Sequence, residues 1–401
     1  MTRDEKRIVS LMGCSHALNH GFFLIYPAVL LLLQKEFSID YLNLGLIGNI
    51  MNLTYGLGAL PVGLIYNRLG PKRLYLLCFL GLSLASIGVG ISSNLLHFAV
   101  GLAFLGAAGS IYHPLANALI TGKVREYGKA LGLHGSAGNL GLATAPFMVG
   151  LFASRFGWRC AYLWFALPGI ALSVWALFVD MSLRKEIEKR DPTSSRMVLS
   201  QSLKNYLSLP LICLYLINIM INFSFVGSIT FLPACLAKQT SFHLFSLDNV
   251  AIGGMLSAIV LFMGVFGQFI GGILSQKLHL ERRFLLVNIL SFPFILAMSF
   301  TTNLLLLFFG LIFFFLNFFL QPMSNTLLAR YTTLEMRGTA FGIFFFVAFG
   351  LGSFASTVSG FIAQEFGLKW VFSGIGGSVL LLILLSSFLL RIKKPDSANA
   401  D

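Results

Sequence analysis

Long apolar stretches recur along the whole chain, and they restrict its possible folds more than any other feature. We place twelve of them at residues 8–33, 44–66, 74–93, 95–121, 128–154, 159–180, 208–236, 247–275, 284–302, 304–329, 338–364 and 370–390. Crossing the hydrocarbon core of a bilayer takes a helix of roughly 20 residues, and the stretches are close to that length or longer. Charged residues make up only 11% of the 401 positions, whereas soluble domains carry about 25%. The sequence therefore predicts an all-α polytopic membrane protein with twelve transmembrane helices.

The chain carries a net charge of +13, and the positions of its basic residues explain that excess. Of the 28 Lys and Arg residues, 23 lie in the termini or in the loops that share their side of the predicted membrane. Basic loops stay in the cytoplasm when a membrane protein inserts. We therefore predict that both termini are cytoplasmic, that the protein lies in a bacterial inner (plasma) membrane, and that it has no nucleic-acid partner.

The two halves of the chain resemble each other when one is shifted by about 209 residues. Residues 63–70 then align with residues 272–279, and Pro114 aligns with Pro322 at a nearly equal shift. Because six predicted helices separate equivalent positions, both halves enter the membrane in the same orientation. Parallel repeats of this kind are related by an axis along the membrane normal, with the binding site between them.

This repeat predicts the domain organisation. Residues 1–180 form an N-terminal six-helix bundle, and residues 208–401 form a C-terminal six-helix bundle with a short cytoplasmic tail. The segment between them, 181–207, is charged and contains Pro192 and several serines, which is typical of a cytoplasmic linker.

The loop between the second and third predicted helices reads Gly-Leu-Ile-Tyr-Asn-Arg-Leu-Gly-Pro-Lys-Arg over residues 63–73. With the repeat and the twelve helices, it resembles the major facilitator superfamily, whose signature there is Gly-x-x-x-Asp-Arg-x-Gly followed by two basic residues. The resemblance implies a major facilitator fold and a cytoplasmic gate formed by Gly63, Asn67, Arg68, Gly70, Gln276 and Lys277. An amide replaces the signature's acid in both halves, at Asn67 and Gln276. The alternative is that the basic residues here only maintain the topology.

Within that superfamily the chain is similar to the fosmidomycin-resistance branch of drug exporters. The matching residues are Ser15-His16-Ala17-Leu18-Asn19-His20 and the segment from Gly106 to Pro114. The fifth predicted helix also resembles the glycine-rich motif of antiporters, although Ala145 and Val149 replace two of its glycines. The resemblance implies efflux by antiport rather than import, with helix-bending or packing roles for Pro114, Gly132, Gly141, Pro146 and Gly150. Close helix packing alone would also explain these residues.

Four of the seven histidines lie in the interior of predicted transmembrane helices, away from the helix ends: His16, His20, His113 and His134. The fifteen acidic residues all lie in loops, tails or helix ends. Ionisable side chains are costly within a bilayer and therefore indicate function, and histidine changes its charge between about pH 5 and 8. We expect these histidines to carry the coupling protons, with helix irregularities nearby at Gly21 and Pro114. The alternative is that each is a neutral histidine that hydrogen-bonds between helices.

A pair such as His16 and His20, spaced by four residues on one helix, can also bind zinc. No acidic residue or pair of cysteines inside the predicted membrane region completes such a site. We therefore expect no metal site, no cofactor and no enzymatic activity.

Polar residues inside other predicted helices are candidates for the wall of a substrate cavity, because an unpaired amide is costly in lipid. The candidates are Asn19, Tyr112, Asn117, Asn218, Asn222, Asn317, Gln321 and Asn325. Hydrogen bonding between helices is the alternative role. The many phenylalanines near the C-terminal amides favour an amphipathic cargo.

Taken together, these features predict a secondary active transporter that works by alternating access and exports an amphipathic small molecule or drug in exchange for protons. We expect a monomer embedded in lipid. The alternatives are a metabolite importer or a lipid transporter of the same fold, or a transport-inactive sensor or assembly protein.

Overall fold

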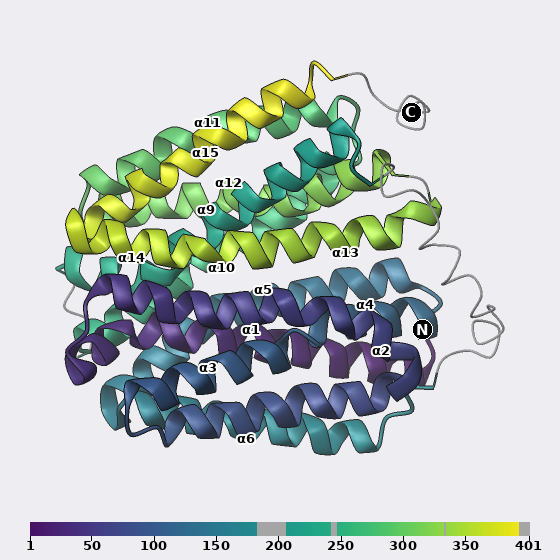
Figure 1. Cartoon of the computed structure of the whole chain (residues 1–401), viewed down its shortest axis with the longest axis horizontal. Helices are drawn as coiled ribbons and strands as arrows, with labels where there is room; N and C mark the ends of the chain where they lie inside the picture. Colours follow the sequence, from purple (N-terminus) through teal and green to yellow (C-terminus); the bar gives the residue numbers. More distant parts are fainter. Residues whose placement is uncertain (183–205, 242–246, 333, 393–401) are drawn as a thin grey trace.

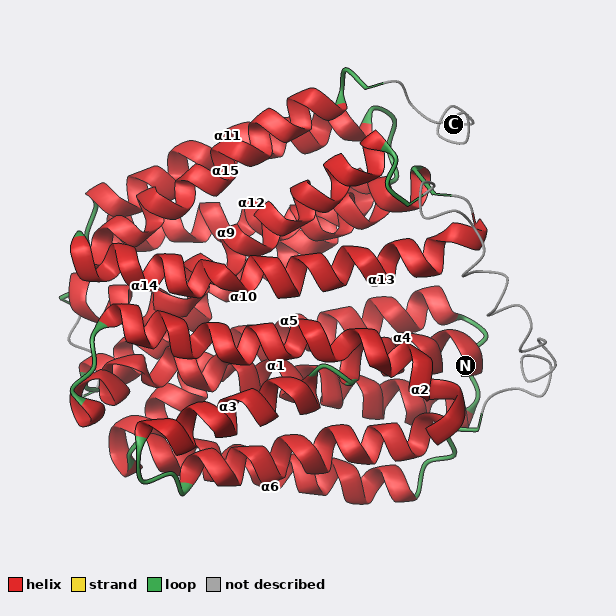
Figure 2. Ribbon diagram, in the orientation of Figure 1, coloured by secondary structure: helices red, strands yellow, loops and turns green. Residues whose placement is uncertain are grey.

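The computed structural model describes residues 1–182, 206–241, 247–332 and 334–392, and these ranges contain helices and no strand (Figure 2). The first half contains α1 (Arg3–Phe37), α2 (Tyr41–Gly90), α3 (Leu95–Gly109), α4 (Tyr112–Lys123), α5 (Tyr127–Phe156) and α6 (Trp158–Leu177). The second half contains α9 (Leu209–Gln239), α10 (Asn249–Ser275), α11 (Leu280–Phe300), α12 (Asn303–Arg330), α13 (Leu334–Leu351), α14 (Ala355–Glu365) and α15 (Val371–Leu389), with short 3₁₀ turns at Gly352–Phe354 and Leu368–Trp370. Most of the predicted linker lies outside the described residues.

Within the described residues, eleven helical segments are long and apolar enough to cross a membrane. The remaining predicted crossing is the first arm of α2, residues 41–69. At Gly70 the backbone has φ 73° and ψ 160°, which ends this arm and starts the next. A positive φ of this kind is readily adopted only by glycine. The turn at Gly70 therefore separates the two predicted helices that α2 contains.

The helices form two bundles that lie side by side, α1 to α6 in one and α9 to α15 in the other (Figure 1). The N-terminus and the end of α15 lie at the same end of the molecule, which we call the terminal end. Within the first bundle α1 packs against α5, and α2 packs against α3. The first bundle carries the histidines, so its packing positions the candidate site.

The two bundles meet through α2 with α14 and through α5 with α10. Glycines allow these helices to approach closely. A Cβ atom added to Gly45 would lie 2.3 Å from the carbonyl oxygen of Ser356, and one added to Gly360 would lie 2.3 Å from that of Tyr41. The interface therefore depends on positions that tolerate no side chain.

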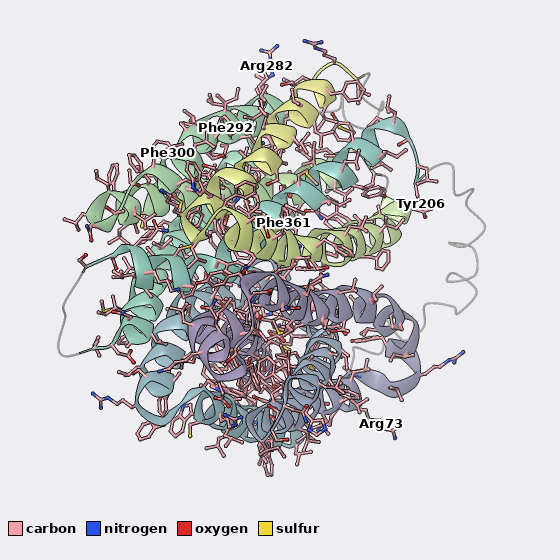
Figure 3. The ribbon with its side chains drawn as sticks, turned by 60° about the vertical axis from the view of Figure 1, so that its left-hand side comes forward. Arg73, Tyr206, Arg282, Phe292, Phe300 and Phe361 are labelled. Carbon is pink, nitrogen blue, oxygen red and sulfur yellow. The ribbon has the colours of Figure 1, made fainter. Side chains whose placement is uncertain are left out.

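Many large apolar side chains point away from the bundles. Phe300 has an exposed fraction of 70% and Phe361 one of 48% (both are labelled in Figure 3). The charged side chains of Arg73 and Arg282 also project from the surface in that view. A continuous apolar exterior of this extent fits contact with lipid rather than water.

Candidate functional site

The fourth predicted transmembrane helix is interrupted where the candidate site lies. α3 ends at Gly109 and α4 starts at Tyr112, so that Tyr112, His113 and Pro114 occupy the first turn of α4. Proline fits a first helical turn because the N–H that it lacks has no partner there. Ser110 and Ile111 thus separate α3 from α4, and Pro114 follows directly in the first turn of α4.

The irregularity expected at Gly21 is wrong, because α1 runs from Arg3 to Phe37 without a break. A Cβ atom added to Gly21 would lie 2.6 Å from Cε1 of Phe165. Gly21 thus provides space for an aromatic ring of α6 and does not bend its own helix.

The structure brings all four predicted histidines together between α1, α4 and α5. The rings of His16 and His134 stack with their centroids 4.1 Å apart. The ring centroid of His16 also lies 4.7 Å from that of His20 and 5.0 Å from that of His113. Residues that are more than 100 positions apart in the chain therefore form one cluster, which we call the histidine cluster.

Two hydrogen bonds determine which nitrogens of His16 and His134 carry protons. Nδ1 of His16 lies 2.8 Å from the carbonyl oxygen of His134. A carbonyl oxygen only accepts, so this nitrogen donates, and Nε2 of the neutral ring carries a lone pair. Tyr112 donates its hydroxyl proton to the carbonyl oxygen of Met12, so its oxygen accepts from Nε2 of His134, 2.9 Å away.

The burial of the cluster varies from ring to ring. His16 and His134 are buried, with exposed fractions of 8% and 4%, whereas His20 and His113 are half-buried. Nε2 of His16 has no hydrogen-bond partner within the described residues. The cluster therefore has an enclosed side and a more open side.

Asn19, one turn from His16 on α1, is also buried. Its amide lies beside the Tyr55 hydroxyl without forming a hydrogen bond of good geometry. A Cβ atom added to Gly109 would lie 3.4 Å from its Oδ1 atom. Asn19 thus lies in the same interior region as the cluster, at the point where α3 ends.

The candidate amides of α9 form hydrogen bonds between helices. Asn218 donates to the carbonyl oxygen of Phe344 at 2.8 Å, and Asn222 donates to that of Ala348 at 2.7 Å. In each half, a side-chain N–H of the first transmembrane helix therefore donates to a main-chain carbonyl oxygen of the fifth. The first half uses an imidazole for this bond, and the second half uses amides.

The remaining cavity candidates lie in different environments. Asn317 is buried and lies 3.5 Å from the Ser224 hydroxyl, at the limit for a hydrogen bond. Gln321 and Asn117 are exposed, and Asn325 is half-buried with its Oδ1 atom unpartnered within the described residues. In the described part of the chain, no interaction joins these four residues to the histidine cluster.

The predicted gate residues lie at the terminal end. Gly63 and Asn67 belong to α2, Gly70 forms the turn described above, and Arg68 is exposed. Gln276 and Lys277 line a cleft of about 700 Å³ between α5 and α10, together with Lys129 and Gly132. Within the cleft wall, the Asn139 amide donates to the side-chain oxygen of Gln268 across the two bundles.

The predicted packing residues of α5 occupy two kinds of position. Gly141 packs against α1, where an added Cβ atom would lie 2.3 Å from Cα of Ala17. Pro146 and Gly150 face α10 of the other bundle, since a Cβ atom on Gly254 would lie 2.2 Å from the carbonyl oxygen of Pro146. Gly132 has open space around it.

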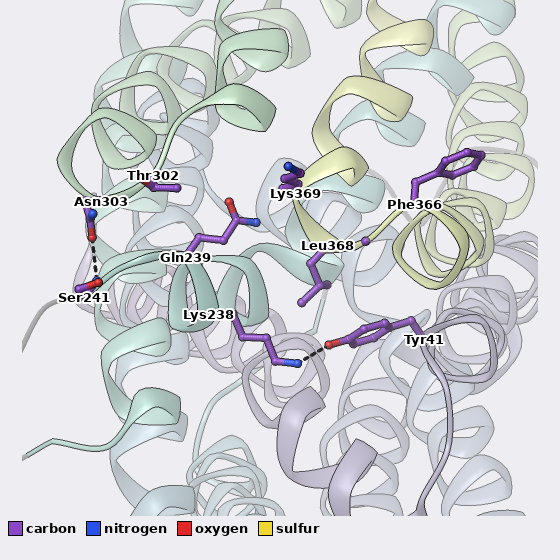
Figure 4. Close-up of a pocket in the computed structure, with 10 residues that line it drawn as sticks. Tyr41, Lys238, Gln239, Ser241, Thr302, Asn303, Phe366, Leu368 and Lys369 are labelled. Atoms are coloured by element: carbon purple, nitrogen blue, oxygen red, sulfur yellow. Dashed lines mark hydrogen bonds between the residues drawn. The ribbon is translucent and has the colours of Figure 1, made fainter.

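Sequence reasoning missed a contact between the bundles at the end opposite the terminal end. Lys238 donates to the Tyr41 hydroxyl at 2.7 Å (Figure 4). Both residues line a pocket of about 640 Å³, which also contains Lys369. No motif marks either residue, because the contact arises only when the two halves pack together.

Comparison with known proteins places these features among membrane transporters. A family model described as the Major Facilitator Superfamily matches residues 11–357. The multidrug resistance protein MdtG of Klebsiella pneumoniae is 25% identical over 405 residues, covering 98% of this chain and 95% of MdtG. The probable sulfoacetate transporter SauU of Cupriavidus necator is 25% identical over 400 residues, covering 91% and 90%. The fold also matches that of a bacterial homologue of the human lysosomal transporter Spinster, with a TM-score of 0.80, 15% identity, and coverage of 98% of this chain and 97% of that one.

Proposed function

Because the chain belongs to the major facilitator superfamily, whose members are membrane transporters and not enzymes, we propose that it is a secondary active exporter that exchanges protons for an amphipathic small molecule. The observation that carries this proposal is the histidine cluster, in which four imidazoles from α1, α4 and α5 meet inside the first bundle. The coupling protons bind there.

Protons are the coupling ion that this site favours. The acidic residues of the described helices all lie in first or last turns, near the ends of the bundles. Histidine is the side chain whose charge changes near neutral pH, and an imidazole must be reachable from outside to exchange its proton. His20 and His113 are half-buried, which favours proton exchange at these two rings, whereas His16 and His134 are buried.

Alternating access is supported by the distribution of contacts between the bundles. The Lys238 to Tyr41 hydrogen bond and the Gly45 to Gly360 approach both lie opposite the terminal end. At the terminal end α5 and α10 border a cleft of about 700 Å³, and the hydrogen bond from Asn139 to Gln268 is the contact there that must break as the cleft widens. With the termini in the cytoplasm, as the basic loops favour, this arrangement corresponds to a state open to the cytoplasm.

Export and amphipathic cargo are supported by chemistry and by similarity. The α5 residues that resemble the antiporter motif, Gly141, Pro146 and Gly150, all lie at close helix contacts. The cleft wall combines polar groups such as Gln268 with apolar ones such as Phe269. MdtG, which is similar along nearly its full length, carries a name that describes multidrug resistance. We place this protein in a bacterial inner membrane, where it works as a monomer.

The test starts in a bacterial strain that lacks its own drug exporters. Expression of the chain should protect this strain against some members of a panel of amphipathic compounds. Protein reconstituted into liposomes should then accumulate a protected compound against its gradient when a pH gradient is imposed. A variant with glutamine at His16, His20, His113 and His134 should lose the pH-driven accumulation, whereas His97→Gln, at the start of α3, should keep it.

The outcomes separate the proposal from its alternatives. Full pH-driven accumulation by the fourfold variant would refute coupling through histidine. Transport by the wild-type chain that does not depend on the pH gradient would indicate a uniporter. Binding of a compound without any flux would favour a sensor over a transporter.

A further inference from the structure

Three side chains of the histidine cluster lie close enough to share one ion. His16 and His20 are one turn apart on α1, and His113 lies in the first turn of α4. One nitrogen atom from each of the three rings lies within 4.8 Å of the other two. We propose that His16, His20 and His113 form a binding site for a transition-metal ion such as zinc, in place of the sequence-based expectation of no metal site. The ion and the coupling protons then compete for the same ring nitrogens.

The free nitrogen of His16 is the first argument for this site. Its Nδ1 atom donates to the carbonyl oxygen of His134, so the lone pair of the neutral ring is on Nε2. This Nε2 atom is buried and has no hydrogen-bond partner within the described residues. A histidine that ligates a metal usually donates its other ring N–H to a backbone carbonyl or a carboxylate in this manner. His16 therefore already has the hydrogen bonding of a metal ligand.

The freedom of the other two rings is the second argument. Among the described residues, no hydrogen bond holds a ring nitrogen of His20 or His113. Both residues are half-buried, and no hydrogen bond within the described part of the chain restrains the rotation of either ring. Zinc–nitrogen bonds of about 2.0–2.1 Å in a tetrahedral site place the nitrogens roughly 3.3 Å apart. Rotation of these two rings can bring the three nitrogens from within 4.8 Å of one another to this shorter spacing.

The surroundings of His16 are shaped to hold its ring. A Cβ atom added to Gly138 of α5 would lie 2.3 Å from Cε1 and 2.4 Å from Nδ1 of His16. Only glycine at this position leaves room for the imidazole. The third ligand, His113, lies at the start of α4 because the fourth crossing is interrupted before Tyr112. The sequence pair His16 and His20 thus gains its third donor from α4, which packs against α1.

The donor set indicates which ions fit. Imidazole nitrogen suits zinc, copper, iron and nickel, whereas calcium and magnesium take oxygen ligands. Three protein ligands leave a fourth tetrahedral position open. Three neutral imidazoles leave the charge of the ion uncompensated, so we expect an anionic fourth ligand, either hydroxide or an oxygen atom of a bound molecule.

The test is direct metal binding to the purified full chain in detergent, with an affinity tag free of histidine and with prior removal of metal by chelator. Cobalt(II) serves as the probe, because in tetrahedral sites it absorbs visible light strongly and zinc displaces it. We expect one equivalent of cobalt. His16→Gln, His20→Gln and His113→Gln should each weaken its binding by about tenfold or more. His97→Gln lies outside the cluster and should leave the affinity unchanged.

A second pair of variants distinguishes the loss of a metal ligand from the loss of the folded structure. Gly138→Ala should displace the His16 ring and weaken cobalt binding, whereas Gly135→Ala, with open space around it on the same helix, should not. Size-exclusion profiles check that each variant is folded. A folded wild-type chain that binds no cobalt overturns the proposal, and so does an unchanged cobalt spectrum in the triple histidine variant. Since this experiment involves no transport, its failure and the failure of the proposed function are distinguishable.

Discussion

His16 donates its Nδ1 proton to the main-chain carbonyl oxygen of His134, 2.8 Å away, across the contact between α1 and α5. This bond has two effects. It ties together two helices whose histidines lie 118 positions apart, and it leaves the lone pair of His16 on the buried Nε2 atom. The chemistry proposed for the site depends on this one orientation of the ring.

Gly138→Ala should disrupt that orientation. The new methyl group would overlap the His16 ring, and small misplacements of reacting groups cost roughly 10- to 100-fold in rate. We expect a loss of pH-driven transport of that order, measured in proteoliposomes. Gly135→Ala on the same helix is the matched control, because nothing lies within 4 Å of its added Cβ atom. Equal transport by both variants would show that the position of His16 is unimportant.

Tyr112→Phe should destabilise the protein, because it leaves Nε2–H of the buried His134 without its acceptor. An unsatisfied buried donor costs about 1–3 kcal/mol, and a thermal unfolding assay in detergent would detect that loss. Tyr162→Phe is the control, since the Tyr162 hydroxyl is buried without a partner among the described residues. A larger loss of stability from Tyr162→Phe than from Tyr112→Phe would contradict the assigned hydrogen bonds.

Gly45→Val should hinder closure of the bundles opposite the terminal end. Its side chain would collide with the carbonyl oxygen of Ser356 on α14. We expect less cross-linking between cysteines placed at Tyr41 and Lys238, which are in contact in this structure. Gly88→Val, also on α2, has open space and should not change the yield. If both variants cross-link like the parent, the glycine approach does not control closure.

The predicted topology can be tested by labelling. In a background without native cysteines, Ser194→Cys in the linker and Thr240→Cys after α9 should react with impermeant reagents from opposite sides of the membrane. The reason is the concentration of basic residues in the loops on the terminal side. Reaction of both positions from outside the cell would reverse the orientation proposed here.

The ion pair between Lys123 and Asp180 predicts a small dependence of stability on acid. The hydrogen bond from Lys123 lowers the pKa of the Asp180 carboxyl from 3.8 to about 2. The stabilisation is therefore complete above about pH 4 and is lost as the pH falls toward 2. Since Asp180 is 63% exposed, its contribution should stay within about 1 kcal/mol. Asp180→Asn should thus change unfolding little at pH 7, and it should reduce the difference in unfolding temperature between pH 4 and pH 2.

Much of the fold follows from patterns that are local in the sequence. The length of each apolar stretch identifies it as a transmembrane helix, because a segment in lipid must satisfy its own backbone hydrogen bonds. Gly70 marks the turn between two crossings, and Pro114 marks the start of α4. Four buried or half-buried histidines stand out equally well, since ionisable residues are rare in such segments. Each of these features needs only neighbouring residues to be recognised.

Packing between helices that are distant in the sequence determined which of the candidate side chains contact one another. His16 and His20 share a helix face, but His113 and His134 join them only because α4 and α5 pack against α1. Asn218 and Asn222 could equally have faced a cavity, yet the carbonyl groups of α13 lie within reach of both amides. Gly21 could have bent its helix, but Phe165 of α6 fills the space beside it. A local pattern shows which side chains need partners, and the packing of helices that are distant in the sequence determines which partners they have.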